Sequence, residues 1–182
     1  WRQDPVSQVP IALGANWSQV APFVLTSAGQ FVLAAPPALT SPEYAAAFNE
    51  AKALGGDGLT TTNVRSADDT ETGIFWAYDG TPSLCAPPRL YNQIARLIAD
   101  QQNLGLLDYT RLLALINASM GDAGIAAWHS KYLYKFWRPV TGIREADAGT
   151  GPTLLGDGNA ATIADPTFLP FGAPASILAS SS

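Results

Sequence analysis

The feature that most constrains this sequence is a long stretch without proline whose apolar residues recur at helical spacing. From Asp108 onward, one face is continued in steps of three and four residues, and the next proline is Pro139. The positions on that face are Leu112, Leu115, Ile116, Ser119, Ala123 and Ala126. The spacing predicts one long helix that begins near Asp108 and ends before Pro139.

Three shorter helices are predicted upstream by local start and stop signals. Ser41-Pro42-Glu43 combines an N-cap, a proline at the first helical position and an acid in the first turn, and Gly55-Gly56 ends that segment. Ser66 and Asp69 resemble a capping box that opens a second helix, which runs towards residues 78–80. Pro87-Pro88 opens a third, whose apolar residues Leu90, Ile94, Leu97 and Ile98 have helical spacing.

The remaining segments are rich in proline, glycine and aspartate. Residues 1–40 carry prolines at 5, 10, 22, 36 and 37, which indicates irregular chain that wraps over the surface. Residues 41–139 form the predicted helical core, and residues 140–182 form a loop region. No sustained alternation of polar and apolar residues is present, so the sequence predicts an all-α helical bundle with long ordered loops, folded as one domain over residues 1–182.

Composition excludes several classes of protein. Of the 182 residues, 47% are hydrophobic and 14% charged, which is typical of a folded chain. The net charge of −5 argues against a nucleic-acid or membrane-surface binder, and no apolar run is long enough to span a bilayer. Cys85 is the sole cysteine, so no disulfide forms within the chain. A chain that begins with Trp1 is expected to have lost its true N-terminus, and a secreted or periplasmic location is favoured.

Positive charge is concentrated in the stretch WHSKYLYKFWRPVTGIR, residues 128–144. It holds four of the ten basic residues and the one histidine, and it has no acid. Lys131 and Arg138 are two helical turns apart, so one continuous helix would place both on one face, with Arg138 at its C-terminal end because of Pro139. Two explanations of this pattern are open. The basic residues could form a solvated face that compensates the helix dipole. Alternatively, they could bind a tetrahedral oxyanion in a site that the neighbouring aromatic residues partly desolvate.

The order Lys131, six residues, then Arg138-Pro139 resembles the first motif of the superfamily of type 2 phosphatidic acid phosphatases, bacterial acid phosphatases and vanadium-dependent haloperoxidases. The surrounding sequence resembles the haloperoxidase branch from WRQDP to FGAPAS. The stretches that carry this similarity are GIFWAYDGTPSLCAPPRLYNQIA, DAGIAAWHSKYLYKFWRPVTGIR and DPTFLPFGAPAS. The resemblance implies part of a larger haloperoxidase-type helical fold.

The resemblance also implies roles for individual residues. Lys131 and Arg138 match the family residues that bind equatorial oxygens of vanadate, for which phosphate or sulfate can substitute, and the family lysine is thought to polarise peroxide. Trp128 matches a tryptophan beside the halide pocket of similar fungal chloroperoxidases, although ordinary core packing also explains a tryptophan there. Asp79 matches an acid that pairs with a vanadate-binding arginine, or is simply a turn residue.

The sequence departs from the family in one respect. Neither the Pro-Ser-Gly-His motif nor the later Ser-Arg-to-His motif of the family occurs in this sequence. His129 does not match the family's apical ligand and is predicted to lie at the surface. We therefore expect no metal ligand within this chain and an apical histidine in a missing C-terminal part. Three explanations of the missing motifs are open: a second chain completes the fold, the protein is truncated, or the chain is a degenerate relative.

The predicted function is a vanadium-dependent haloperoxidase that uses hydrogen peroxide to oxidise chloride or bromide and delivers halogen to an organic acceptor. Two alternatives remain: an acid phosphatase of the same superfamily, and a catalytically inactive helical interaction module.

Overall fold

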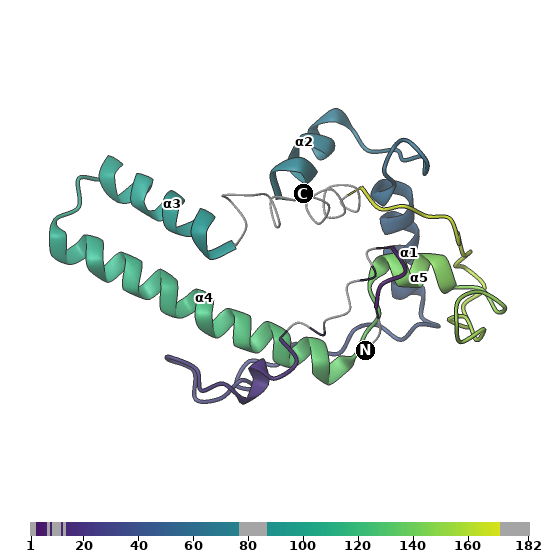
Figure 1. Ribbon diagram of the computed structural model, residues 1–182, viewed down its shortest axis with the longest axis horizontal. Helices are drawn as coiled ribbons and strands as arrows, with labels where there is room; N and C mark the ends of the chain where they lie inside the picture. The colour runs from purple at the N-terminus through teal and green to yellow at the C-terminus, as the bar shows by residue number, and fades with distance from the viewer. Residues whose placement is uncertain (1–2, 7, 9–11, 13, 77–86, 172–182) are drawn as a thin grey trace. The chain divides into compact units, whose positions relative to one another are not determined.

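The computed structural model describes residues 3–6, 8, 12, 14–76 and 87–171. Their regular structure is helical and includes no strand; one isolated bridge joins Gly56 and Pro170. The all-α prediction is confirmed. In chain order the elements are η1 (Trp17–Gln19), α1 (Pro42–Gly55), α2 (Ala67–Trp76), α3 (Pro87–Gln101), α4 (Leu106–Tyr134) and α5 (Pro139–Glu145) (Figure 1). None of the helices in the described ranges is long and apolar enough to cross a membrane.

The chain divides into two compact units. Unit 1 comprises Trp1–Ile11, Ala35–Ala77 and Phe136–Ser182. Unit 2 comprises Ala12–Ala34 and Tyr78–Lys135. The organisation of residues 1–182 as part of one larger domain stays a prediction, and each unit is described by itself.

Unit 1 is built around α1 and α5. The predicted start of α1 is confirmed, because the Ser41 side chain accepts a hydrogen bond from the Tyr44 amide at 3.2 Å and Pro42 occupies the first turn. One face of α1 packs against α5 and the loop that follows it. The buried cluster consists of Tyr44, Phe48, Ile143, Ala146 and Phe168.

Hydrogen bonds hold the loop after α5 to helix α1 and to the residues just before α1. Asn159 donates to the Leu39 carbonyl at 2.9 Å, and Lys52 donates to the Ile163 carbonyl at 2.8 Å. Inside the loop, the Thr162 hydroxyl donates to the buried Asp157 carboxylate at 2.7 Å. Residues 140–145, which the sequence analysis assigned to the loop region, instead belong to helix α5, because Pro139 begins a new helix. From Ala146 to Phe171, the last described residue, the chain has no further helix.

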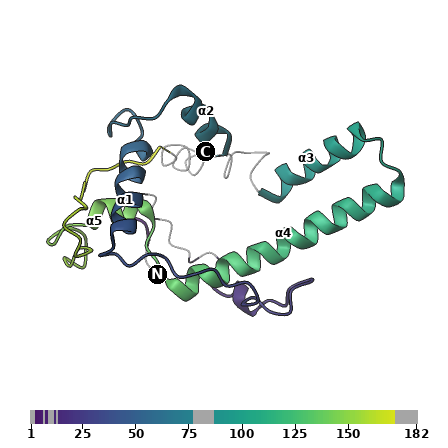
Figure 2. The same ribbon diagram turned by 180° about the vertical axis from the view of Figure 1, so that it is seen from behind.

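Unit 2 contains a hairpin of α3 and α4, which lie side by side in both Figure 1 and Figure 2. Ala95 and Ala99 are buried on α3, and such small side chains let two helices approach closely. Asn92 and Asn117 exchange amide hydrogen bonds of 3.0 and 2.9 Å across the pair. These reciprocal bonds fix the register of the two helices.

Residues 14–34, which we call the N-terminal strap, are tied to α4. The Asp122 carboxylate accepts hydrogen bonds from the Phe23, Val24 and Leu25 amides at 2.6, 2.8 and 2.9 Å. The Tyr134 hydroxyl donates to the Leu33 carbonyl. Apart from the single turn of η1 the strap has no helix, in agreement with its predicted irregular character.

The prediction that Lys131 and Arg138 share one helical face is wrong. Helix α4 ends at Tyr134 because Lys135 adopts the left-handed conformation, with φ 50° and ψ 30°, while its amide bonds the Lys131 carbonyl at 3.1 Å. Arg138 is extended, as expected before a proline, but it is the N-cap of α5 rather than the C-terminal end of α4. The two cations therefore belong to different helices.

Candidate oxyanion-binding site

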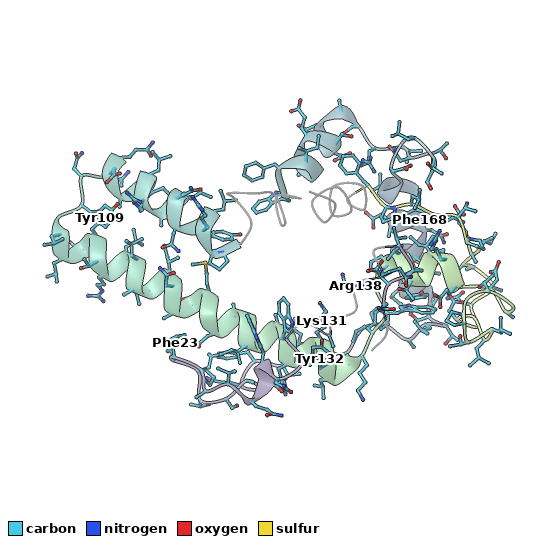
Figure 3. The ribbon with its side chains drawn as sticks, in the orientation of Figure 1. Phe23, Tyr109, Lys131, Tyr132, Arg138 and Phe168 are labelled. Carbon is cyan, nitrogen blue, oxygen red and sulfur yellow. The ribbon has the colours of Figure 1, made fainter. Side chains whose placement is uncertain are left out.

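Lys131 lies on the last turn of α4 (Figure 3). Its ammonium nitrogen is 4.9 Å from the centroid of the Trp128 ring, within the range of a cation–π contact. Trp128 is half-buried and Lys131 is exposed. An ammonium held over an aromatic face loses part of its hydration.

The Trp128 indole is in turn packed against the N-terminal strap. The rings of Trp17 and Trp128 have centroids 5.2 Å apart and planes tilted by 36°. The backbone of Gly14 approaches the indole so closely that a Cβ at position 14 would lie 1.6 Å from Trp128 Cδ1. Packing therefore accounts for one side of this ring, and its place in a halide pocket stays a prediction.

Arg138 lies in unit 1, at the start of α5, and its side chain is exposed. The aromatic residues that follow Lys135 belong to unit 1. Phe136 packs edge-on against Tyr44 with ring centroids 6.1 Å apart. Trp137 lies against Gly142, where a Cβ would be 3.2 Å from Trp137 Nε1.

Tyr44, which packs against Phe136, has a strongly raised pKa. Burial, and then the negative charge of Asp157, raise the pKa of Tyr44 to about 12, although a hydrogen bond with Trp137 works in the opposite direction. The phenol is therefore neutral at physiological pH. Its ring packs in the core beside α5 and its hydroxyl can form a hydrogen bond. A neutral phenol carries no negative charge that would repel an anion.

His129 was predicted at the surface, and the structure finds it half-buried. Its ring lies against the strap, since a Cβ at Gly29 would be 3.5 Å from His129 Nε2. The strap covers a helical face that sequence spacing alone leaves exposed. In the described parts of the chain, no group of three or more His, Cys, Asp or Glu side chains is arranged to hold a metal ion.

Two residues named from the sequence, Asp79 and Cys85, lie outside the described residues. Sequence reasoning missed Gly14, Trp17 and Asp122, which position Trp128 and the strap. Asp122 carried a usable signal, because a carboxylate bracketed by Gly121 and Gly124 interrupts the small, apolar face of a helix. Gly14 and Trp17 carried none, since their contacts on α4 are distant in sequence.

Comparison with known proteins gives sequence similarity across the stretch that holds both cationic residues. A family model described as the VCPO second helical-bundle domain matches residues 111–181, a range that includes both Lys131 and Arg138. The chain is also 38% identical over 157 residues to vanadium chloroperoxidase from Curvularia inaequalis. That match covers 79% of this chain and 24% of the relative, so the chain spans about a quarter of the relative's length.

The resemblance to the vanadium haloperoxidases is thereby confirmed over most of the sequence. The family model and the relative both belong to the chloroperoxidase branch that the sequence motifs indicated.

Proposed function

We propose that this chain supplies part of the active site of a vanadium-dependent haloperoxidase, which oxidises chloride or bromide with hydrogen peroxide. The observation that carries the proposal is the Lys131 ammonium held over Trp128, within a sequence similar to vanadium chloroperoxidase. Bound vanadate would supply Lewis acidity and a carrier for peroxide.

The donor set fits such an oxyanion. A guanidinium donates two parallel hydrogen bonds to neighbouring oxygens, and an ammonium provides a compact charge that follows the oxygen it binds. Arg138 and Lys131 would each donate hydrogen bonds to oxygens of the bound oxyanion, and Lys131 would also polarise peroxide. The indole of Trp128 would offer an electropositive ring edge to a weakly hydrated halide.

The apolar residues exposed on α3 and α4 support the proposal that further protein completes the fold. Leu97 and Ile98 are 59% and 48% exposed, and Leu106 and Leu107 are each 82% exposed. Apolar side chains this numerous on adjoining helix surfaces are typical of faces that another part of a protein covers. A second chain or a further segment of the same polypeptide is the proposed partner.

The test uses the protein purified intact from its source and incubated with orthovanadate. Peroxide-dependent halogenation of an acceptor dye is measured with chloride and with bromide, and hydrolysis of a chromogenic phosphate ester is measured in parallel. We expect halogenation that requires vanadate. Ester hydrolysis without halogenation would favour the phosphatase, and neither activity would favour the interaction module.

The Lys131→Gln variant tests the residue assignment. Because hydrogen bonds to charged groups contribute about 1.5–3 kcal/mol, vanadate affinity should fall roughly 10- to 100-fold. Lys135→Gln is the matched control, since it removes the same charge from an exposed position four residues further along the chain. Equal losses in the two variants would contradict a specific role for Lys131.

A further inference from the structure

Three contacts meet on the Trp128 ring: the Gly14 backbone, the Trp17 ring and the Lys131 ammonium. We infer that Gly14 and Trp17 are positioning residues for Lys131, acting through Trp128. The N-terminal strap would then set the direction of the anion-binding ammonium. The relevance of this role to catalysis rests on the proposed function, whereas the positioning itself does not.

Gly14 fixes the indole by close backbone approach. A Cβ at this position would lie 1.6 Å from Trp128 Cδ1 and 1.8 Å from Nε1, far inside contact distance. The φ of Gly14 is +71°, a conformation that also favours glycine. Any larger residue must therefore push the indole away from its present position, and the ammonium above it must follow.

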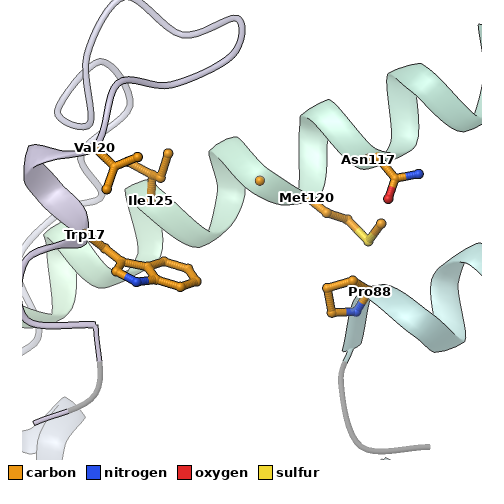
Figure 4. Close-up of a pocket in the computed structure, with 7 residues that line it drawn as sticks. Trp17, Val20, Pro88, Asn117, Met120 and Ile125 are labelled. Carbon is orange, nitrogen blue, oxygen red and sulfur yellow. The ribbon is translucent and has the colours of Figure 1, made fainter.

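Trp17 fixes the indole from the one-turn helix η1. Its own ring is set against α4, because a Cβ at Gly124 would be 2.8 Å from Trp17 Cζ3. Figure 4 shows Trp17 beside Ile125 at one end of an apolar pocket of about 430 Å³, which Pro88 and Met120 also line. On its other side the Trp17 ring contacts the Trp128 ring.

The strap itself is anchored independently of these aromatic contacts. The three amide hydrogen bonds to Asp122 begin at Phe23, and Phe23 lies over Gly121, where a Cβ would be 2.8 Å from its ring. Substitutions at positions 14 and 17 should therefore disturb Trp128 and leave the rest of the strap attached to α4.

The test is competitive labelling of lysine amines with acetic anhydride, read for each lysine by mass spectrometry on the intact protein. The chain has three lysines, and Lys52 and Lys135 serve as internal references. Loss of a cation–π platform should raise the Lys131 labelling rate about 2- to 5-fold in Trp17→Leu and Gly14→Ala, with Lys52 unchanged. Trp17→Phe keeps an aromatic ring and should restore most of the protection.

Gly149→Ala is the matched control for Gly14→Ala. Gly149 has a φ of +88° and no atom near its missing Cβ, so the variant shares the backbone strain without the clash. It should leave the Lys131 rate unchanged. If Gly14→Ala fails to fold, as judged by circular dichroism, the pair Trp17→Leu and Trp17→Phe decides the question.

Repeating the labelling with orthovanadate separates the two proposals. Protection of Lys131 by orthovanadate in the unsubstituted protein supports the anion site, and its absence overturns that site while the positioning result stands. A Lys131 rate that is unchanged in folded Trp17→Leu overturns the positioning role, whatever orthovanadate does. Equal rates in Trp17→Leu and Trp17→Phe would also overturn it, because the aromatic ring would then be irrelevant.

Discussion

Phe168 offers the sharpest test of what holds Arg138 in place. It is 2% exposed and packs with Tyr44, Phe48 and Ile143, so it joins the loop after α5 to both α1 and α5. Truncation to alanine removes roughly 2–3 kcal/mol of burial free energy. The cavity left behind adds about 1–2 kcal/mol, because surrounding side chains collapse only in part. The free energy of unfolding of Phe168→Ala should therefore fall by about 3–5 kcal/mol.

The measurement is urea unfolding followed by circular dichroism, with the slope of the transition compared between variants. Leu155→Ala is the control, because Leu155 lies in the same loop but is 79% exposed, and its effect should stay within about 0.5 kcal/mol. A loss below about 1 kcal/mol for Phe168→Ala, with an unchanged slope, would refute the assignment of this residue to the core.

Two further predictions concern pH. Burial raises the pKa of Asp122, but its hydrogen bonds from the Leu25, Phe23 and Val24 amides outweigh that effect, so the pKa lies below its ordinary value. Attachment of the strap should therefore be complete above the ordinary carboxyl pKa and lost as pH falls through the lowered value. The protection factor of the Val24 amide, which corrects the exchange rate for the intrinsic pH dependence of exchange, should fall as the pH decreases, and Asp122→Asn should show reduced protection already at neutral pH. Tyr44, with its pKa raised to about 12, stabilises unit 1 fully below its ordinary pKa of 10.0, and this contribution is lost as pH rises through about 12. The loss should be roughly 1–2 kcal/mol after allowance for solvent screening, and Tyr44→Phe should abolish this pH dependence.

Much of the fold could be predicted from the sequence because its signals are local. Ser41, Pro42 and the glycines at 55 and 56 mark the limits of α1, and periodicity marks α4. The end of α4 could not be predicted, because the left-handed residue there is Lys135 and no glycine announces it. A continuous helix up to Pro139 was the simpler expectation from spacing alone.

The candidate site was predicted unevenly for a related reason. Lys131, Arg138 and Trp128 were found because they share one short stretch that resembles a family motif. Their supports, Gly14 and Trp17, reach Trp128 only after the strap has folded back on α4. Contacts between residues so distant in sequence depend on the tertiary fold, and neither spacing nor composition encodes them visibly.

The break at Lys135 bears differently on Lys131 and on Arg138 in the two explanations of the basic stretch. Compensation of a helix dipole suits Lys131, which lies at the C-terminal end of α4, where a cation gains about 0.3–1 kcal/mol. It cannot explain Arg138, because the N-cap of α5 is the positive end of its helix and disfavours a cation. The proposed role of Arg138 in binding an anion does not depend on the helix dipole.

Arg138→Gln should therefore leave stability unchanged or raise it by up to about 0.5 kcal/mol, since the cation gains nothing from the helix and its side chain is exposed. The same variant should weaken orthovanadate binding by about 10-fold or more. Urea unfolding and equilibrium dialysis measure the two effects, with Arg111→Gln, an exposed site on α4, as the control. A stability loss above about 1 kcal/mol with unchanged affinity would mean that Arg138 serves the fold rather than an anion.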